Sequence, residues 1–176
     1  LVRELFRSFR RKARKGVTSL IPNPTILYPH KKEVRRLLND VLQYTDVVQV
    51  NHREAAIFLG VTEDEFKFPS HVIKMWEILH PLGVKTVLIT DGANGAYSIT
   101  GGKYQATEAH PCPTVVDTTG AGDAFHAAFI ALLSEGYSVP QCLKGGAFAA
   151  TGNIMIEGGH SGIPDRAQLN PYMRRI

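Results

Sequence analysis

The chain has 176 residues, 44% of them hydrophobic and 20% charged, a balance typical of a globular domain large enough to bury a core. No run approaches the roughly 18 apolar residues of a membrane-spanning helix, so we expect no membrane partner. The two cysteines, Cys112 and Cys142, are too few for a disulfide-rich scaffold and predict free thiols in a cytoplasmic protein.

The net charge of +4 is unevenly distributed. Residues 1–36 carry eleven Lys or Arg against two Glu, and residues 37–176 carry nine against fourteen Asp or Glu. The pattern of residues 1–15 predicts a helix with an apolar face on a core and a basic face in solvent. Nucleic-acid binding by that basic face is the weaker alternative. The apolar face holds Val2, Phe6, Phe9 and Ala13, and the basic face holds Arg3, Arg7, Arg10 and Arg14.

Helical and strand patterns then alternate along the chain. The β-branched run at residues 85–90 is typical of a strand buried on both faces, and Gly101–Gly102 indicates a hairpin turn. In chain order, we expect a strand at 17–21, a helix at 31–43, a strand at 46–50, a helix at 53–59 ending at Gly60, a helix at 70–80 capped by Ser70, a strand at 85–90, a turn at 91–95, hairpin strands at 96–100 and 103–108, and helices at about 123–135 and 139–156.

This alternation predicts an α/β fold with a mostly parallel sheet covered by helices on both faces, in a single domain over residues 1–176. Ligands bind such sheets beyond the carboxyl ends of the strands. Polar residues and glycines gather at those predicted ends, which indicates a ligand site there. They are Asn51, Thr90, Gly92 and residues 120–123.

The stretch D-T-T-G-A-G-D at residues 117–123 allows two interpretations. In one, the glycines let the backbone approach a phosphate at a helix N-terminus, and Asp123 accepts a proton from an attacking hydroxyl. In the other, the glycines form a tight turn and Asp123 is only the helix N-cap. The spacing alone does not decide between them. Neither the P-loop pattern nor a G-x-G-x-x-G after a strand occurs in the sequence.

Extended to residue 125, this stretch resembles the second signature of the PfkB (ribokinase-like) carbohydrate kinases, a highly specific motif. Three further segments resemble motifs of that family in the family's order: N-H-R-E at 51–54, I-T-D-G-A-N-G-A at 89–96, and G-G-H-S-G-I-P at 158–164. The resemblance runs from about Gly16 to Pro164. It implies a three-layer, Rossmann-like fold and an ATP-dependent kinase that phosphorylates a hydroxymethyl group of a sugar or nucleoside.

The resemblance also implies residue roles and the cofactors ATP and Mg²⁺, with K⁺ as a third. Asp123 would be the general base that deprotonates the acceptor hydroxyl. The backbone amides of Gly120, Ala121 and Gly122 would form the anion hole for the phosphates. The remaining implied roles are nucleotide contacts by Thr90, Gly92, Gly95 and Gly159, organisation of hydrated Mg²⁺ by Asn51 and Glu54, and binding of a monovalent cation by Asp117 and Thr119.

Simpler roles stay open for several of these residues. Thr90 can merely end a strand, and Asn51 can merely start a turn. Glu54 can be a solvated acid in the first turn of a helix, where the helix dipole favours negative charge. We interpret His126, one turn into the helix after Asp123, as a packing residue.

The sequence departs from the family in two places. The family's N-terminal sugar-binding half and lid have no counterpart, and its D-x-N-x-R stretch aligns with residues 21–25, where Asn23 is kept but Ile21 and Thr25 replace Asp and Arg. We therefore expect a partial domain. It is either part of a kinase or a truncated, non-catalytic nucleotide-binding protein with a role in regulation or assembly. Because a truncated sheet exposes an edge and an apolar face, we expect a homo-oligomer or a covering partner chain.

Overall fold

The structure, a computed structural model, describes residues 2–12, 16–22 and 39–173. The chain forms two compact units, Leu1–Thr90 with Ser98–Tyr104, and Asp91–Tyr97 with Gln105–Ile176. The single domain over residues 1–176 stays a prediction, because two compact units can both belong to one domain.

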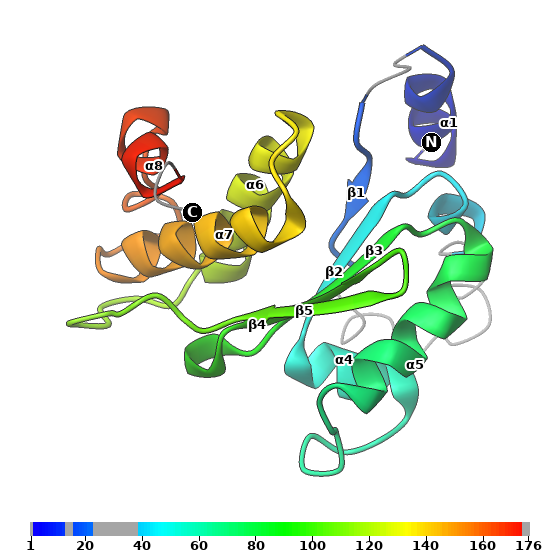
Figure 1. Ribbon diagram of the computed structural model, residues 1–176, viewed down its shortest axis with the longest axis horizontal. Coiled ribbons are helices and arrows are strands. Elements are labelled where there is room, and N and C mark those ends of the chain that lie inside the picture. The colour runs from blue at the N-terminus through cyan, green and yellow to red at the C-terminus, as the bar shows by residue number, and fades with distance from the viewer. Residues whose placement is uncertain (1, 13–15, 23–38, 174–176) are drawn as a thin grey trace. The chain divides into compact units, whose positions relative to one another are not determined.

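Five strands form one sheet in the order β1-β2-β3-β4-β5 (Figure 1). Its parallel part joins β1 (Ser19–Leu20), β2 (Val47–Asn51) and β3 (Thr86–Thr90), with Val48 opposite both Leu20 and Val87. The interior residues of β2 and β3 are buried, as strands covered on both faces require. The α/β class and the mostly parallel sheet are confirmed.

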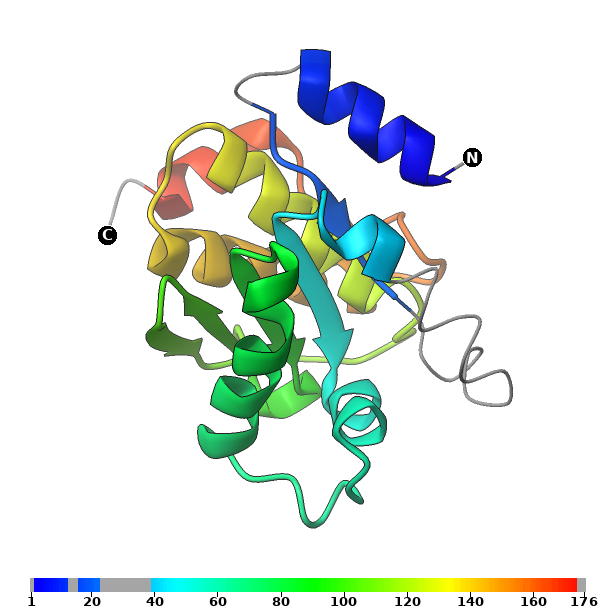
Figure 2. The same cartoon turned by 90° about the vertical axis from the view of Figure 1, so that its right-hand side faces the viewer.

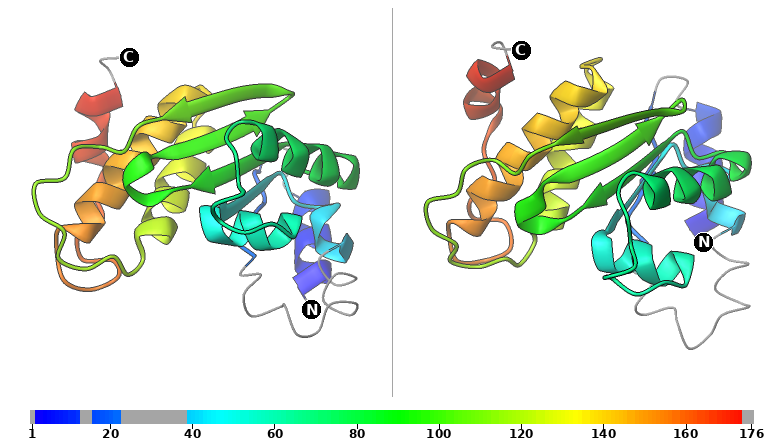
Figure 3. Two further views of the ribbon diagram at one scale, coloured as in Figure 1. Left: turned by 90° about the horizontal axis from the view of Figure 1, so that it is seen from below. Right: turned by 60° about the horizontal axis from the view of Figure 1, so that its bottom comes forward.

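The predicted hairpin is also present. The strands β4 (Ala96–Thr100) and β5 (Lys103–Thr107) flank Gly101–Gly102, and Figure 3 shows them running side by side. The hydroxyl groups of Thr86 and Thr100 lie 3.0 Å apart and join β3 to β4.

In the first unit, α4 (His52–Leu59) and α5 (Ser70–Leu79) pack against β2 and β3 (Figure 2). Helix α4 ends, as predicted, at Gly60 in the left-handed conformation. The prediction that Ser70 caps α5 is wrong. Its hydroxyl donates to the Lys67 carbonyl, and Pro69 occupies the N-cap position. The short 3-10 helix η2 (His80–Leu82) follows α5.

Helix α1 (Val2–Lys12) covers the described part of the first predicted helix. The prediction that its apolar face packs on a core is only partly right, because Leu5 is 61% and Phe9 43% exposed while Phe6 is half-buried. Arg3 and Arg7 are exposed, as predicted. Four predictions lie partly or wholly outside the described residues: the core contacts of Val2 and Ala13, the exposure of Arg10 and Arg14, the helix at 31–43, and the roles of Asn23 and Thr25. In the described part of the predicted helix at 31–43, residues 39–42 are helical.

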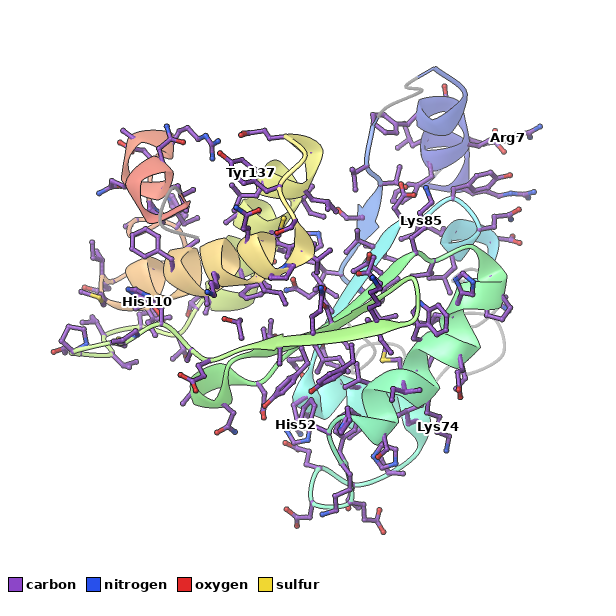
Figure 4. All side chains as sticks on the ribbon, in the orientation of Figure 1. Arg7, His52, Lys74, Lys85, His110 and Tyr137 are labelled. Carbon is purple, nitrogen blue, oxygen red and sulfur yellow. The ribbon has the colours of Figure 1, made fainter. Side chains whose placement is uncertain are left out.

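The second unit contains the 3-10 helix η3 (Gly92–Asn94), α6 (Ala121–Ser134), α7 (Val139–Ile154) and α8 (Arg166–Met173). Helices α6 and α7 pack closely, because a Cβ atom at Gly146 would lie 2.9 Å from the Phe125 ring. Figure 4 shows Tyr137 at the turn between them. Helix α8 was not expected from the sequence. No helix in the described ranges is long and apolar enough to cross a bilayer.

A buried carboxylate joins β1 to β2. Asp46 accepts hydrogen bonds from the amide and the hydroxyl of Thr18, each at 2.9 Å, and lies 2.9 Å from the ammonium of Lys85, which Figure 4 labels. Because Asp46→Ala leaves the buried Thr18 amide without its acceptor, we expect the free energy of unfolding to fall by about 1–3 kcal/mol. Urea titration measures this.

Asp40→Ala is the matched control for Asp46→Ala. Asp40 lies 4.0 Å from the exposed Arg3, and such surface pairs contribute roughly 0–1 kcal/mol. Equal losses in the two variants would contradict a structural role for Asp46.

Candidate functional site

Helix α6 begins at a glycine turn. Gly120 is the N-cap, with φ 73° and ψ 2°, in the left-handed region that favours glycine, and it has no side chain with which to cap the helix. Asp123 is therefore the third helical residue. Both the interpretation of Asp123 as the N-cap and the predicted start at about residue 123 are wrong, because a glycine with positive φ turns the chain into the helix earlier.

The glycine turn lies against the loop that follows α7. A Cβ atom at Gly120 would overlap the carbonyl oxygen of Gly159 and lie 2.9 Å from its carbonyl carbon. A Cβ atom at Gly159 would in turn lie 3.3 Å from the Thr119 methyl carbon. The structure thus brings together two predicted site residues, Gly120 and Gly159, that are far apart in the sequence. Gly120 and Gly159 therefore meet through backbone atoms alone.

Asp117 organises the turn before Gly120. One carboxylate oxygen accepts a hydrogen bond from the Thr119 amide at 2.9 Å, and the other accepts one from the Gly158 amide at 3.1 Å. These bonds, the Thr119 bond first, lower the pKa of Asp117 below its ordinary 3.8. Because its pKa is lowered, Asp117 keeps its negative charge at neutral pH. The same segment is also tied to the end of α7, since the amides of Val116 and Asp117 both donate to the Ile154 carbonyl.

The lowered pKa of Asp117 predicts a pH-dependent stability. Because the folded state favours the ionised form, its contribution is fully present above the unfolded pKa and is lost as the pH falls through the lowered folded pKa. We expect the unfolding temperature of Asp117→Asn to lie below that of the parent chain at pH 6. The gap should shrink below pH 3.8. Thermal unfolding from pH 6 to about pH 2.5 measures this, and a gap that stays constant throughout would contradict it.

Asp123 and His126 share the first turns of α6. The Asp123 side chain is exposed, and no described residue hydrogen-bonds or ion-pairs with its carboxylate. Burial lowers the pKa of the half-buried His126, and the charge of Asp123 partly opposes that decrease. Asp123 is therefore an accessible carboxylate that can accept a proton.

Gly92 and Gly95 lie in the turn after β3. The Asp91 amide donates to the Gly95 carbonyl at 2.8 Å and closes this turn. A Cβ atom at Gly95 would lie 2.9 Å from the Glu108 carbonyl carbon, whereas one at Gly92 would meet nothing within 4 Å. The close contact with residue 108 explains why position 95 is a glycine, whereas no described atom crowds Gly92.

The other predicted site residues belong to the first unit. Asn51 lies directly opposite Thr90, so both stand at the carboxyl ends of neighbouring parallel strands, as predicted. Asn51 also caps α4: its Oδ1 accepts from the Glu54 amide at 2.8 Å, and Glu54 Oε2 accepts from the Asn51 amide at 2.9 Å. This capping box buries Glu54, which is 8% exposed, so the interpretation of Glu54 as a solvated acid is wrong. No described residue hydrogen-bonds Glu54 Oε1.

Residues 4–166 match the model of the pfkB family carbohydrate kinases. The chain belongs to the PfkB family. It is 36% identical to the ribokinase of Arabidopsis thaliana over 132 residues, which are 74% of this chain and 34% of that protein. It is 31% identical to adenosine kinase 1 of the same plant over 134 residues, which are 73% of this chain and 38% of that protein.

A solved structure confirms the ribokinase-type fold of this PfkB chain. The structure of Arabidopsis thaliana ribokinase complexed with ribose and ATP superposes with a TM-score of 0.67 and 32% identity. The match covers 77% of this chain and 43% of that one. This chain therefore spans less than half the length of these PfkB relatives.

Sequence reasoning assigned no role to two residues near the PfkB glycine turn. They are Gly158, whose amide binds Asp117, and Asn153, whose side-chain amide donates to the Thr119 carbonyl at 2.8 Å. The sequence feature that could have pointed to Asn153 is that it is the single amide residue within the mostly apolar stretch 145–154.

Proposed function

We propose that this chain forms the nucleotide-binding part of an ATP-dependent sugar kinase, which transfers the γ-phosphoryl group of ATP to a hydroxymethyl group of a sugar or nucleoside. The contact between Gly120 and Gly159 at the start of α6 carries the proposal. Because Gly120 and Gly159 meet through backbone atoms and the N-cap glycine has no side chain, a phosphate can approach the start of the helix, where the helix dipole favours anions.

Asp123 is the proposed general base. Its carboxylate takes the proton from the acceptor hydroxyl, whose oxygen bonds to the γ-phosphorus as the bond to the β–γ bridging oxygen breaks and ADP leaves. The amides of Gly120, Ala121 and Gly122 stabilise the charge on the phosphate oxygens. The Ala121 amide donates to the Thr118 carbonyl at 3.3 Å, a long bond that a phosphate oxygen can replace.

Mg²⁺ supplies charge neutralisation when it is bound with ATP. Glu54 and Asn51 are proposed to hold it through water, because Mg²⁺ prefers oxygen ligands with retained waters and no described residue hydrogen-bonds Glu54 Oε1. Asp117, which keeps its charge, and Thr119 are proposed to bind a monovalent cation, K⁺. The proposed nucleotide contacts are Thr90, Gly92, Gly95 and Gly159.

A partner chain or a second copy is proposed to cover the first unit. Its strand β1 has two residues and lies at the sheet edge, and Leu5, Phe9 and Ile21 are exposed. The alternative function, a non-catalytic nucleotide-binding role in regulation or assembly, is favoured by Ile21 and Thr25, which stand where the family's D-x-N-x-R stretch has Asp and Arg. In either case we propose a cytoplasmic protein that does not act on nucleic acid.

Calorimetric titration with ATP·Mg²⁺, followed by a coupled assay of ADP release, tests the proposal. The acceptors are ribose, adenosine, fructose phosphates and 2-keto-3-deoxygluconate, and light scattering records the oligomeric state in the same samples. We expect nucleotide binding and ADP release stimulated by one acceptor class. Binding without any stimulated release would favour the non-catalytic alternative, and absence of nucleotide binding would reject both.

A further inference from the structure

Asn153 is a buried polar residue near the end of α7. It is 0% exposed, and its Nδ2 donates to the Thr119 carbonyl oxygen at 2.8 Å. A carbonyl oxygen only accepts hydrogen bonds, so the amide must present its NH₂ group to Thr119. That requirement sets the orientation of the side chain.

The remaining amide oxygen, Oδ1, is buried and has no hydrogen-bond partner among the described residues. A buried acceptor without a donor disfavours folding, whereas leucine, of similar size, would carry no unmade hydrogen bond. Stability of α7 therefore does not explain why position 153 is an asparagine. We look for the explanation in the effect of the hydrogen bond from Asn153 on the Thr119 carbonyl.

The bond fixes the peptide plane between Thr119 and Gly120. In a planar trans peptide the carbonyl and the following N–H point in opposite directions. Because Asn153 draws the Thr119 carbonyl toward α7, the Gly120 amide hydrogen points away from α7. The same peptide leads into the left-handed N-cap, so its orientation also sets how the chain enters α6.

We propose that Asn153 is a positioning residue that aims the Gly120 amide outward and so pre-orients the first donor of the anion site. The nature of the anion rests on the proposed function, whereas the positioning itself does not. The side chain of Asn153 reaches the proposed phosphate only through the Thr119–Gly120 peptide.

The variant Asn153→Leu distinguishes an effect on the orientation of the Gly120 amide from an effect on the stability of the fold. It removes the bond to Thr119 together with the unpartnered Oδ1, so we expect the unfolding temperature to stay level or rise. We expect ADP affinity, measured by calorimetry, to fall about tenfold, the loss from one misdirected hydrogen bond to a charged group. We also expect faster hydrogen exchange of residues 118–122 in the nucleotide-free chain. Asn153→Ala, which adds no bulk, repeats the test in case leucine disturbs folding.

Thr151→Val is the matched control. Thr151 lies on the same helix, is 6% exposed, and donates from its hydroxyl to the His110 carbonyl at 3.1 Å, so it makes a comparable bond to a different segment. We expect this variant to keep both its ADP affinity and the exchange rates at 118–122.

Unchanged exchange at 118–122 in both Asn153 variants would overturn the inference, as would equal losses of affinity in the Thr151 control. If the parent chain binds no ADP, the proposed function fails, and the exchange rates alone decide the role of Asn153.

Discussion

Asp123→Asn is expected to lower turnover by about 10²–10⁴-fold while ATP affinity stays nearly unchanged. The amide cannot accept the proton of the acceptor hydroxyl, yet it has the size of the carboxylate. The Asp123 side chain is exposed and is not the N-cap, so its loss breaks no bond within the described chain. Loss of its charge near the helix dipole costs about 0.3–1 kcal/mol of stability.

Turnover is measured as acceptor-stimulated ADP release, with Glu77→Gln on the exposed face of α5 as the control for removing one negative charge. Turnover equal to that of the parent chain would remove Asp123 from the mechanism. A second readout does not depend on activity. Because the charge of Asp123 raises the pKa of His126, NMR titration should find that pKa lower in Asp123→Asn.

Gly120→Ala is expected to abolish nucleotide binding and to lower the free energy of unfolding by about 2–5 kcal/mol. Two costs combine. An alanine at φ 73° is strained, and its methyl group would overlap the Gly159 carbonyl. The chain can relieve that overlap only by moving the loop away from the start of α6, which disrupts the proposed anion site.

Gly136→Ala separates these two costs. Gly136 also has a positive φ, 89°, but a Cβ atom there would meet nothing within 4 Å. This control should lose only the strain term, about 1–3 kcal/mol, and should keep its affinity for ATP. Urea unfolding and calorimetry compare the two variants. Equal losses in both would contradict the close contact between Gly120 and Gly159.

The sequence by itself determined the features that depend on neighbouring residues. The hairpin around Gly101–Gly102 and the end of α4 at Gly60 were predicted correctly, because turn and cap chemistry acts over a few residues. The buried β-branched strand at residues 86–90 followed from its hydrophobic pattern. Helix α8 was missed although Asp165 and Gln168 form a recognisable capping box at its start.

Only the tertiary structure decided how the glycine turn is held. Asn153, Gly158 and Gly159 reach it from the end of α7 and the following loop, through contacts between segments far apart in the sequence. The D-T-T-G-A-G-D motif could be recognised in the sequence. The positive φ of Gly120 and the position of Asp123 as the third residue of α6 could not be predicted from it. The physical reason is that a local pattern sets backbone preferences, whereas the orientation of one peptide plane depends on which distant group bonds to it.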